Sequence, residues 1–133
     1  MLPLSHSNHL ITMSWLTWVF LILAFGFNSV ANVLLKLGSR QGLVLSNLSF
    51  SNLILANWQV WLGCLLFAAN VPFYFLALRS MPISIAYPIM VVMSFLIINL
   101  YAVLFLGEHL VGWQILGYFC LIVGLLLVVL NNH

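Results

Sequence analysis

Residues 84–106 read SIAYPIMVVMSFLIINLYAVLFL, a long apolar stretch that contains no Asp, Glu, Lys or Arg. A helix rises about 1.5 Å per residue, so roughly 20 apolar residues cross the hydrocarbon core of a bilayer. The stretch meets this length, and its few polar side chains are uncharged. It therefore predicts a membrane-spanning helix over 84–106.

Three further stretches satisfy the same criterion, at residues 14–37, 58–79 and 111–130. Amphipathic indole rings favour the membrane–water interface. All five tryptophans lie near the starts of these stretches: Trp15, Trp18, Trp58, Trp61 and Trp113. The sequence thus predicts an all-α integral membrane protein, a bundle of four transmembrane helices that forms a single membrane domain over residues 1–133.

The composition supports this class and excludes others. Of the 133 residues, 65% are hydrophobic and only 3% are charged, whereas about 25% of the residues of a soluble chain are charged. A net charge of +2 is too small and too dispersed for nucleic-acid binding. No nucleophile–base pair or cluster of metal ligands lies at membrane depth, so we expect no enzyme activity, catalytic residue, cofactor or metal site. Cys64 and Cys120 lie in apolar stretches and are interpreted as small packing residues.

The connections leave two questions open. The segment 38–57 fits neither a helix nor a strand pattern, so it either lies on the membrane surface or folds over the bundle. An even number of spans places both termini on one side together with Arg79, and Lys36 and Arg40 on the other. Two cations against one give little positive-inside bias, and the orientation in the membrane stays undecided.

Polar side chains inside the first span form a stripe. Asn28, Asn32 and Lys36 are spaced four residues apart, so they share one face of a helix. An amide in hydrocarbon costs several kcal/mol unless it finds a partner. The stripe therefore either forms interhelical hydrogen bonds that hold the bundle together or lines a cavity.

Two of the spans are interrupted by proline. Asn70 precedes Pro72 by two residues, and Tyr87 directly precedes Pro88. Proline removes one helical hydrogen bond and favours a kink, and broken helices with polar groups at depth are typical of transport pathways. We expect helix kinks at both prolines. The predicted substrate-binding residues are Asn28, Asn32, Lys36, Asn70 and Tyr87.

The last span carries small residues on one face. Gly117, Cys120 and Gly124 lie at positions i, i+3 and i+7, and faces of this kind let helix backbones approach closely. Gly117 and Gly124 are therefore a predicted dimer seam.

Several motifs resemble the drug/metabolite transporter superfamily, in particular its small multidrug resistance-like four-helix proteins. The resemblance covers roughly residues 15–130. It is carried by SVANVLLK at 29–36, LRSMPISIAYPI at 78–89, LGEHL at 106–110, and Gln114, Gly117 and Gly124. Asn28 stands where multidrug exporters carry an essential glutamate, and Val91-Val92-Met93-Ser94 replaces their glycine-rich kink. Tyr87-Pro88 is closer to the EamA-like branch of flippase subunits for aminoarabinose linked to undecaprenyl phosphate.

The resemblance implies a bacterial inner-membrane protein that works as a homodimer or as a heterodimer with a similar four-helix subunit. Lys36, Arg40 and Arg79 suit a lipid phosphate, although anchoring at helix ends explains each of them as well. Three hypotheses follow. The first is a small transporter or flippase subunit that moves a polyprenyl-phosphate-linked or other amphipathic anionic substrate by alternating access, with membrane lipid as a partner. The second is a proton-coupled exporter of hydrophobic cations, and the third is a non-transporting accessory subunit of a larger membrane complex.

Overall fold

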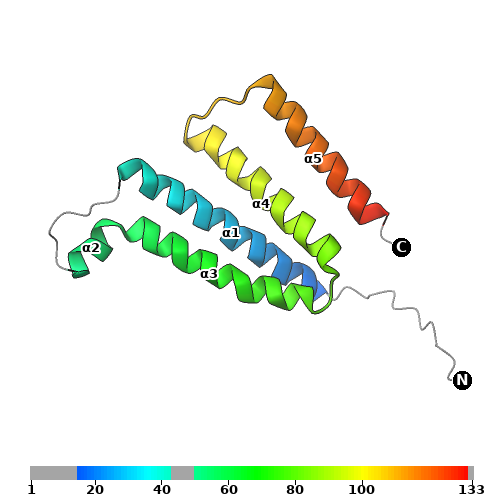
Figure 1. Cartoon of the computed structure of the whole chain (residues 1–133), viewed down its shortest axis with the longest axis horizontal. Coiled ribbons are helices and arrows are strands. Elements are labelled where there is room, and N and C mark those ends of the chain that lie inside the picture. Colours follow the sequence, from blue (N-terminus) through cyan, green and yellow to red (C-terminus); the bar gives the residue numbers. More distant parts are fainter. Residues whose placement is uncertain (1–14, 43–49, 132–133) are drawn as a thin grey trace, which may run out of the picture.

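The computed structural model describes residues 15–42 and 50–131, and all of their regular structure is helical (Figure 1). Its five helices are α1 (Trp15–Gln41), α2 (Phe50–Ala56), α3 (Trp58–Leu78), α4 (Ile83–Phe105) and α5 (Gly112–Leu130). The helices α1, α3, α4 and α5 are each long and apolar enough to cross a membrane. The predicted all-α fold with four transmembrane helices is thus confirmed.

The segment between the first two spans differs from the expectation. Helix α1 continues to Gln41, and α2 forms a further helix of 7 residues that packs against α3. The Asn57 side chain donates a hydrogen bond to the Leu53 carbonyl oxygen at 2.9 Å. A helix of two turns is too short to display a 3.6-residue periodicity, which is why the sequence pattern did not indicate it. Part of the segment, residues 43–49, lies outside the described residues.

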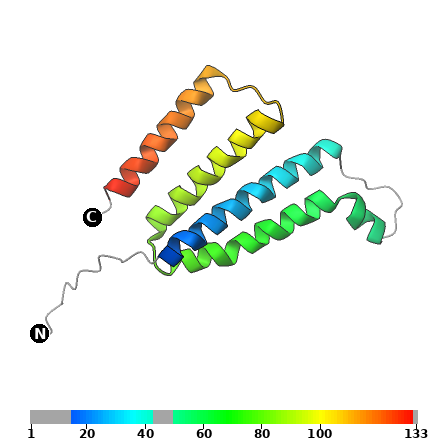
Figure 2. The ribbon, with the colours of Figure 1, turned by 180° about the vertical axis from the view of Figure 1, so that it is seen from behind.

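The four spans lie side by side in the order α3, α1, α4, α5 (Figures 1 and 2). Neighbours α1 and α3 are antiparallel and make the most extensive contact in the chain. Two glycines permit this approach. A Cβ atom at Gly38 would lie 2.6 Å from Val60 Cγ2, and one at Gly63 would lie 3.0 Å from Leu35 Cγ. Larger side chains at these positions would force α1 and α3 apart.

The largest buried cluster lies where the start of α1, the end of α3 and the start of α4 converge. Its residues are Leu21, Ala77, Met81, Ile85, Ala86 and Ile89. Small alanines and branched aliphatic side chains fill this region, so the helices pack closely there without a polar atom in the cluster. Six of the ten buried hydrophobic residues of the described chain lie in this cluster.

Helix α5 contacts α4 and no other helix among the described residues, and it contains no buried residue. Leu125 and Val129 of α5 pack against the buried cluster, and two interactions of Tyr118 join α5 to α4. Its ring meets that of Phe95 edge to face at 5.4 Å, and its hydroxyl donates to Asn99 Oδ1 at 2.9 Å. A Cβ atom at Gly117 or Gly124 would have nothing within 4 Å. The small-residue face is thus open within one chain, and its role as a dimer seam stays a prediction.

Tyr118→Phe is expected to lower the free energy of unfolding by about 0.6 kcal/mol, the average for interhelical hydrogen bonds in membranes. The change removes the hydroxyl that joins α5 to Asn99 of α4 and keeps the ring contact with Phe95. Unfolding in mixed micelles, followed by tryptophan fluorescence, measures the difference. Tyr101→Phe serves as the control because it leaves the Asn99 bond in place. An equal loss in both variants would contradict the assignment.

Candidate functional site

A groove of about 270 Å³ lies between α1 and α4 and is lined by four polar and four apolar residues. The two helices run parallel, so residues near their C-terminal ends meet at the same end of the molecule (Figure 1). The lining residues are Asn32, Val33, Lys36, Ile98, Asn99, Ala102, Leu106 and Glu108. Two predicted site residues, Asn32 and Lys36, therefore lie together in this groove.

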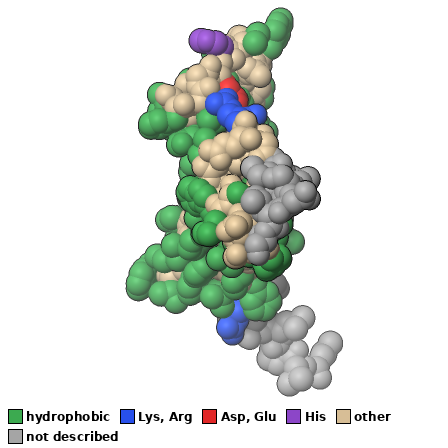
Figure 3. All heavy atoms as spheres, turned by 90° about the vertical axis from the view of Figure 1, so that its left-hand side faces the viewer, with side chains coloured by type: hydrophobic (Ala, Val, Ile, Leu, Met, Phe, Trp, Pro, Cys, Tyr) green, Lys and Arg blue, Asp and Glu red, His purple; other side chains and the backbone are tan. Residues whose placement is uncertain are grey.

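The mouth of the groove carries a cluster of three charges. Lys36 Nζ and Arg40 Nη2 each lie 3.7 Å from the same atom, Glu108 Oε1. All three side chains are about half exposed. Figure 3 shows basic side chains beside the acidic one near one end of the molecule, with a further basic side chain at the opposite end. Two cations share one carboxylate, so the cluster keeps one positive charge in excess.

The turn after α4 positions the carboxylate. Gly107 adopts a φ of 67°, which reverses the chain at a conformation that glycine adopts without strain. The Glu108 N–H then donates to the Ala102 carbonyl oxygen at 3.1 Å. Arg40 in turn donates to the Leu106 carbonyl oxygen at 3.3 Å. The turn is thereby joined to the end of α1 through both backbone and side chain.

Below the charges, amides line the groove. The Asn32 side chain donates to the Asn28 carbonyl oxygen at 2.8 Å, and the Asn99 side chain donates to the Phe95 carbonyl oxygen at 2.7 Å. Each amide thus bonds to the backbone one turn earlier in its own helix. They do not bridge α1 and α4, so they leave the groove between these helices open.

Hydroxyl groups join α1 and α4 still deeper in the spans. Ser29 Oγ donates to the Phe25 carbonyl oxygen at 2.7 Å and lies 3.5 Å from the Ser94 carbonyl oxygen. Ser94 Oγ lies 3.4 Å from the same Phe25 oxygen. Ser29 precedes Lys36 by about two helical turns, which places it about 10 Å deeper along the helix axis. Both serines are buried, so this contact closes the inner end of the polar track.

The remaining predicted residues lie elsewhere. Asn28 is half-buried on α1, one turn deeper than Asn32. Asn70 lies on α3 with 4% of its surface exposed, and its Oδ1 atom has no hydrogen-bond partner in the described chain. Tyr87 is 56% exposed near the start of α4. The structure therefore keeps Asn28, Asn32 and Lys36 along one side of α1, but Asn28, Asn70 and Tyr87 are not among the residues that line the groove.

Sequence reasoning missed the two other polar residues of the lining, Glu108 and Asn99. A signal existed for Glu108, because four spans put the ends of the first and third helices on the same side of the membrane. The one carboxylate of the chain thus had to lie at the same end as Lys36 and Arg40. For Asn99 no signal was available, since its role depends on the rotation of α4 against α1 and α5.

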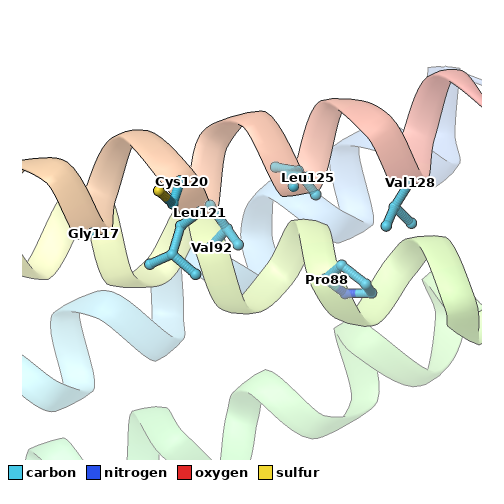
Figure 4. Close-up of a pocket in the computed structure, with 8 residues that line it drawn as sticks. Pro88, Val92, Gly117, Cys120, Leu121, Leu125 and Val128 are labelled. Carbon is cyan, nitrogen blue, oxygen red and sulfur yellow. The ribbon is translucent and has the colours of Figure 1, made fainter.

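A second, apolar groove of about 410 Å³ lies between α4 and α5. Its lining residues are Pro88, Val92, Gly117, Cys120, Leu121, Gly124, Leu125 and Val128. Figure 4 shows Leu121 and Val128 of α5 facing Pro88 and Val92 of α4 across it. Cys64 and Cys120 are both exposed, so the single chain does not bear out their interpretation as small packing residues; Cys120 borders the open groove between α4 and α5.

Both prolines lie inside helices that continue past them, Pro72 in α3 and Pro88 in α4. Pro72 is exposed, whereas Pro88 is half-buried and borders the apolar groove. Each proline lacks the N–H that would bond to the preceding turn. The α4 proline therefore weakens the helix beside a groove, where neighbouring side chains leave room for bending.

Comparison of the chain with models of protein families, with curated proteins and with solved structures finds no match. The four apolar helices make the chain a multi-pass membrane protein, with a polar, positively charged groove between α1 and α4.

Proposed function

We propose that this chain is a small membrane transporter or flippase subunit that moves a lipid-linked or amphipathic anionic substrate. The observation that carries the proposal is the groove between α1 and α4, which leads from the charged cluster at its mouth to the amides of Asn32 and Asn99. A protein that only anchors itself in lipid has no need of such a track, because each polar group at membrane depth costs free energy.

The charges of the groove favour an anion. Lys36 and Arg40 share one carboxylate, and the remaining positive charge attracts a phosphate at the level of the headgroups. The guanidinium of Arg40 presents several N–H donors in a geometry that matches phosphate oxygens. The apolar groove between α4 and α5 lies on the other side of α4 and offers a surface for a hydrocarbon chain. An amphipathic substrate therefore matches both grooves.

A second subunit completes the proposed pathway. The four spans lie in one row, so a single chain does not surround a substrate, and α5 buries no residue. The partner is a second copy or a similar four-helix subunit, and the two move by alternating access. The resemblance to the flippase-subunit branch supports a polyprenyl-phosphate-linked substrate and a bacterial inner membrane.

Reconstitution in vesicles tests this function through the transfer of a fluorescent polyprenyl phosphate between leaflets. Asn32→Leu and Lys36→Ala, which both alter the groove lining, are each expected to lower the initial rate about tenfold, as the loss of one hydrogen bond to a charged group predicts. Arg79→Ala removes a cation at the other end, and Val30→Leu alters an exposed position of α1; both should transfer at the wild-type rate. Wild-type rates in both Asn32→Leu and Lys36→Ala would refute the assignment of the groove.

One observation favours a second candidate, the non-transporting accessory subunit. Helix α5 lies at the edge of the row and buries no residue, and its small-residue face borders the open groove beside α4, where a helix of a larger membrane protein would find room to dock. Purification from native membranes in mild detergent separates the two candidates. A stable complex with a much larger protein, together with no lipid transfer by the isolated chain, would favour the accessory role.

A further inference from the structure

The charged cluster at the mouth of the groove has an unusual composition for an anion-binding site, because the chain supplies its own anion. A single atom, Glu108 Oε1, lies 3.7 Å from both Lys36 Nζ and Arg40 Nη2. Close charge-assisted hydrogen bonds measure about 2.7–2.9 Å, so both contacts are loose. The three side chains are about half exposed, and ion pairs of this kind contribute little stability. The carboxylate is therefore easily replaced.

The two cations form a site that needs an anion. Lys36 and Arg40 are four residues apart on α1, so they face the same side and repel each other when no counter-charge is present. Glu108 neutralises one of the two charges. A phosphate carries more acceptor oxygens than a carboxylate and can contact both cations at once.

The carboxylate is tethered rather than free. The left-handed conformation of Gly107 and the Glu108 N–H bond to Ala102 hold it beside the cations, and tethering gives such a group a high effective concentration. Glu108 therefore occupies the site whenever no external anion is present. The same contact joins the α4–α5 turn to α1, so its replacement removes one contact of that turn and leaves the Arg40 hydrogen bond to the Leu106 carbonyl oxygen.

We propose that Glu108 is an internal competitor that fills the anion site of Lys36 and Arg40 until a phosphate group displaces it. This inference rests on the proposed function, since it assumes that the groove binds an anionic substrate. The ligand chemistry is a phosphate group, held either in a lipid headgroup or in solution.

Titration of the full-length protein in detergent with phosphatidic acid and phosphatidylglycerol, read by native mass spectrometry, tests the proposal. Glu108→Gln should bind both lipids about threefold to fivefold more tightly, as expected when an exposed ion pair no longer competes. Glu108→Asp should show a smaller gain, because its shorter side chain keeps the charge but reaches the cations less well. Ser51→Lys adds the same charge on α2 at this end of the molecule and should change either affinity less than twofold.

The gains in affinity for the two lipids, compared with each other, distinguish displacement of Glu108 from repulsion by a carboxylate that stays in place. A displaced competitor weakens every ligand by the same factor, so the gains for the two lipids should be equal. A carboxylate that stays in place would repel the phosphomonoester, which carries about two charges near pH 7, more strongly than the phosphodiester, which carries one. The proposal would therefore be overturned if Glu108→Gln raised the affinity for phosphatidic acid by a factor close to the square of its factor for phosphatidylglycerol. It would also be overturned if the variant raised neither affinity.

Two further measurements complete the experiment: a variant without the two cations, and competition with inorganic phosphate. Lys36→Gln combined with Arg40→Gln should abolish the gain from Glu108→Gln, and a persistent gain would overturn the proposal. If added inorganic phosphate releases bound phosphatidic acid, the site is assigned to phosphate in solution; if it does not, the site is assigned to the lipid headgroup. In both cases, equal gains in affinity for the two lipids support displacement of Glu108. Displacement without lipid transfer in vesicles would refute the transport function while leaving the competitor role of Glu108 intact.

Discussion

Gly63→Leu is expected to lower the free energy of unfolding by about 2–3 kcal/mol, in the range of overpacking in a close-packed core. A Cβ atom at this position would lie 3.0 Å from Leu35 Cγ and 3.1 Å from the Ala31 carbonyl oxygen. The carbonyl belongs to the backbone of α1, which cannot move without shifting the whole helix. The added side chain therefore separates α1 from α3. Unfolding in mixed micelles, followed by tryptophan fluorescence, measures the loss.

Gly124→Leu is the matched control, because it makes the same change on α5. A Cβ atom at Gly124 would have nothing within 4 Å, so we expect the stability of the single chain to change by no more than about 0.5 kcal/mol. The same variant tests the predicted dimer seam: dissociation of copies without unfolding would support it. Equal destabilisation by Gly63→Leu and Gly124→Leu would contradict the close approach of α1 and α3.

Asn70→Leu is expected to change stability and transport in opposite directions. Asn70 is buried in α3, and its Oδ1 atom has no partner in the described chain. A buried acceptor without a partner costs about 1–3 kcal/mol, so leucine should raise the free energy of unfolding by about 1 kcal/mol or more. Asn70 is also a predicted substrate-binding residue, so its replacement should lower the rate of lipid transfer about tenfold.

Asn99→Leu provides the comparison for stability, because this amide has partners. Its Nδ2 donates to the Phe95 carbonyl oxygen and its Oδ1 accepts a hydrogen bond from the Tyr118 hydroxyl. Removal of the Asn99 amide should therefore lower the free energy of unfolding. Opposite signs for Asn70→Leu and Asn99→Leu are expected in the same unfolding assay. A stabilised Asn70→Leu protein that transfers lipid at the wild-type rate would remove Asn70 from the proposed pathway.

The helical architecture followed from the sequence because length and hydropathy alone decide which segments cross a bilayer. The span predicted over 84–106 begins at Ile83 and ends at Phe105, and the span predicted over 58–79 ends at Leu78. The first helix is longer than predicted, to Gln41, because a helix can continue beyond the hydrocarbon into the headgroup region. There, Lys36 and Arg40 reach the turn after α4.

The candidate site was predicted only along α1. Asn28, Asn32 and Lys36 share a face because helical periodicity is a local property of the chain. Asn99 and Glu108 come from another helix and its turn, and no local pattern relates them to α1. The same applies to Asn70, whose burial between helices depends on how α3 is rotated against α1.

The sequence by itself determined the membrane class, the four spans and the polar face of α1, since each depends on hydropathy and spacing within one segment. Only the tertiary structure decided that α1 lies between α3 and α4, that Glu108 contacts both Lys36 and Arg40, and that α5 lies beside α4 at the edge of the row. These features depend on which faces of the helices meet. When a helix is apolar on every side, hydropathy does not indicate which face packs against a neighbour. Close contacts at residues such as Gly38 and Gly63 then determine which faces meet.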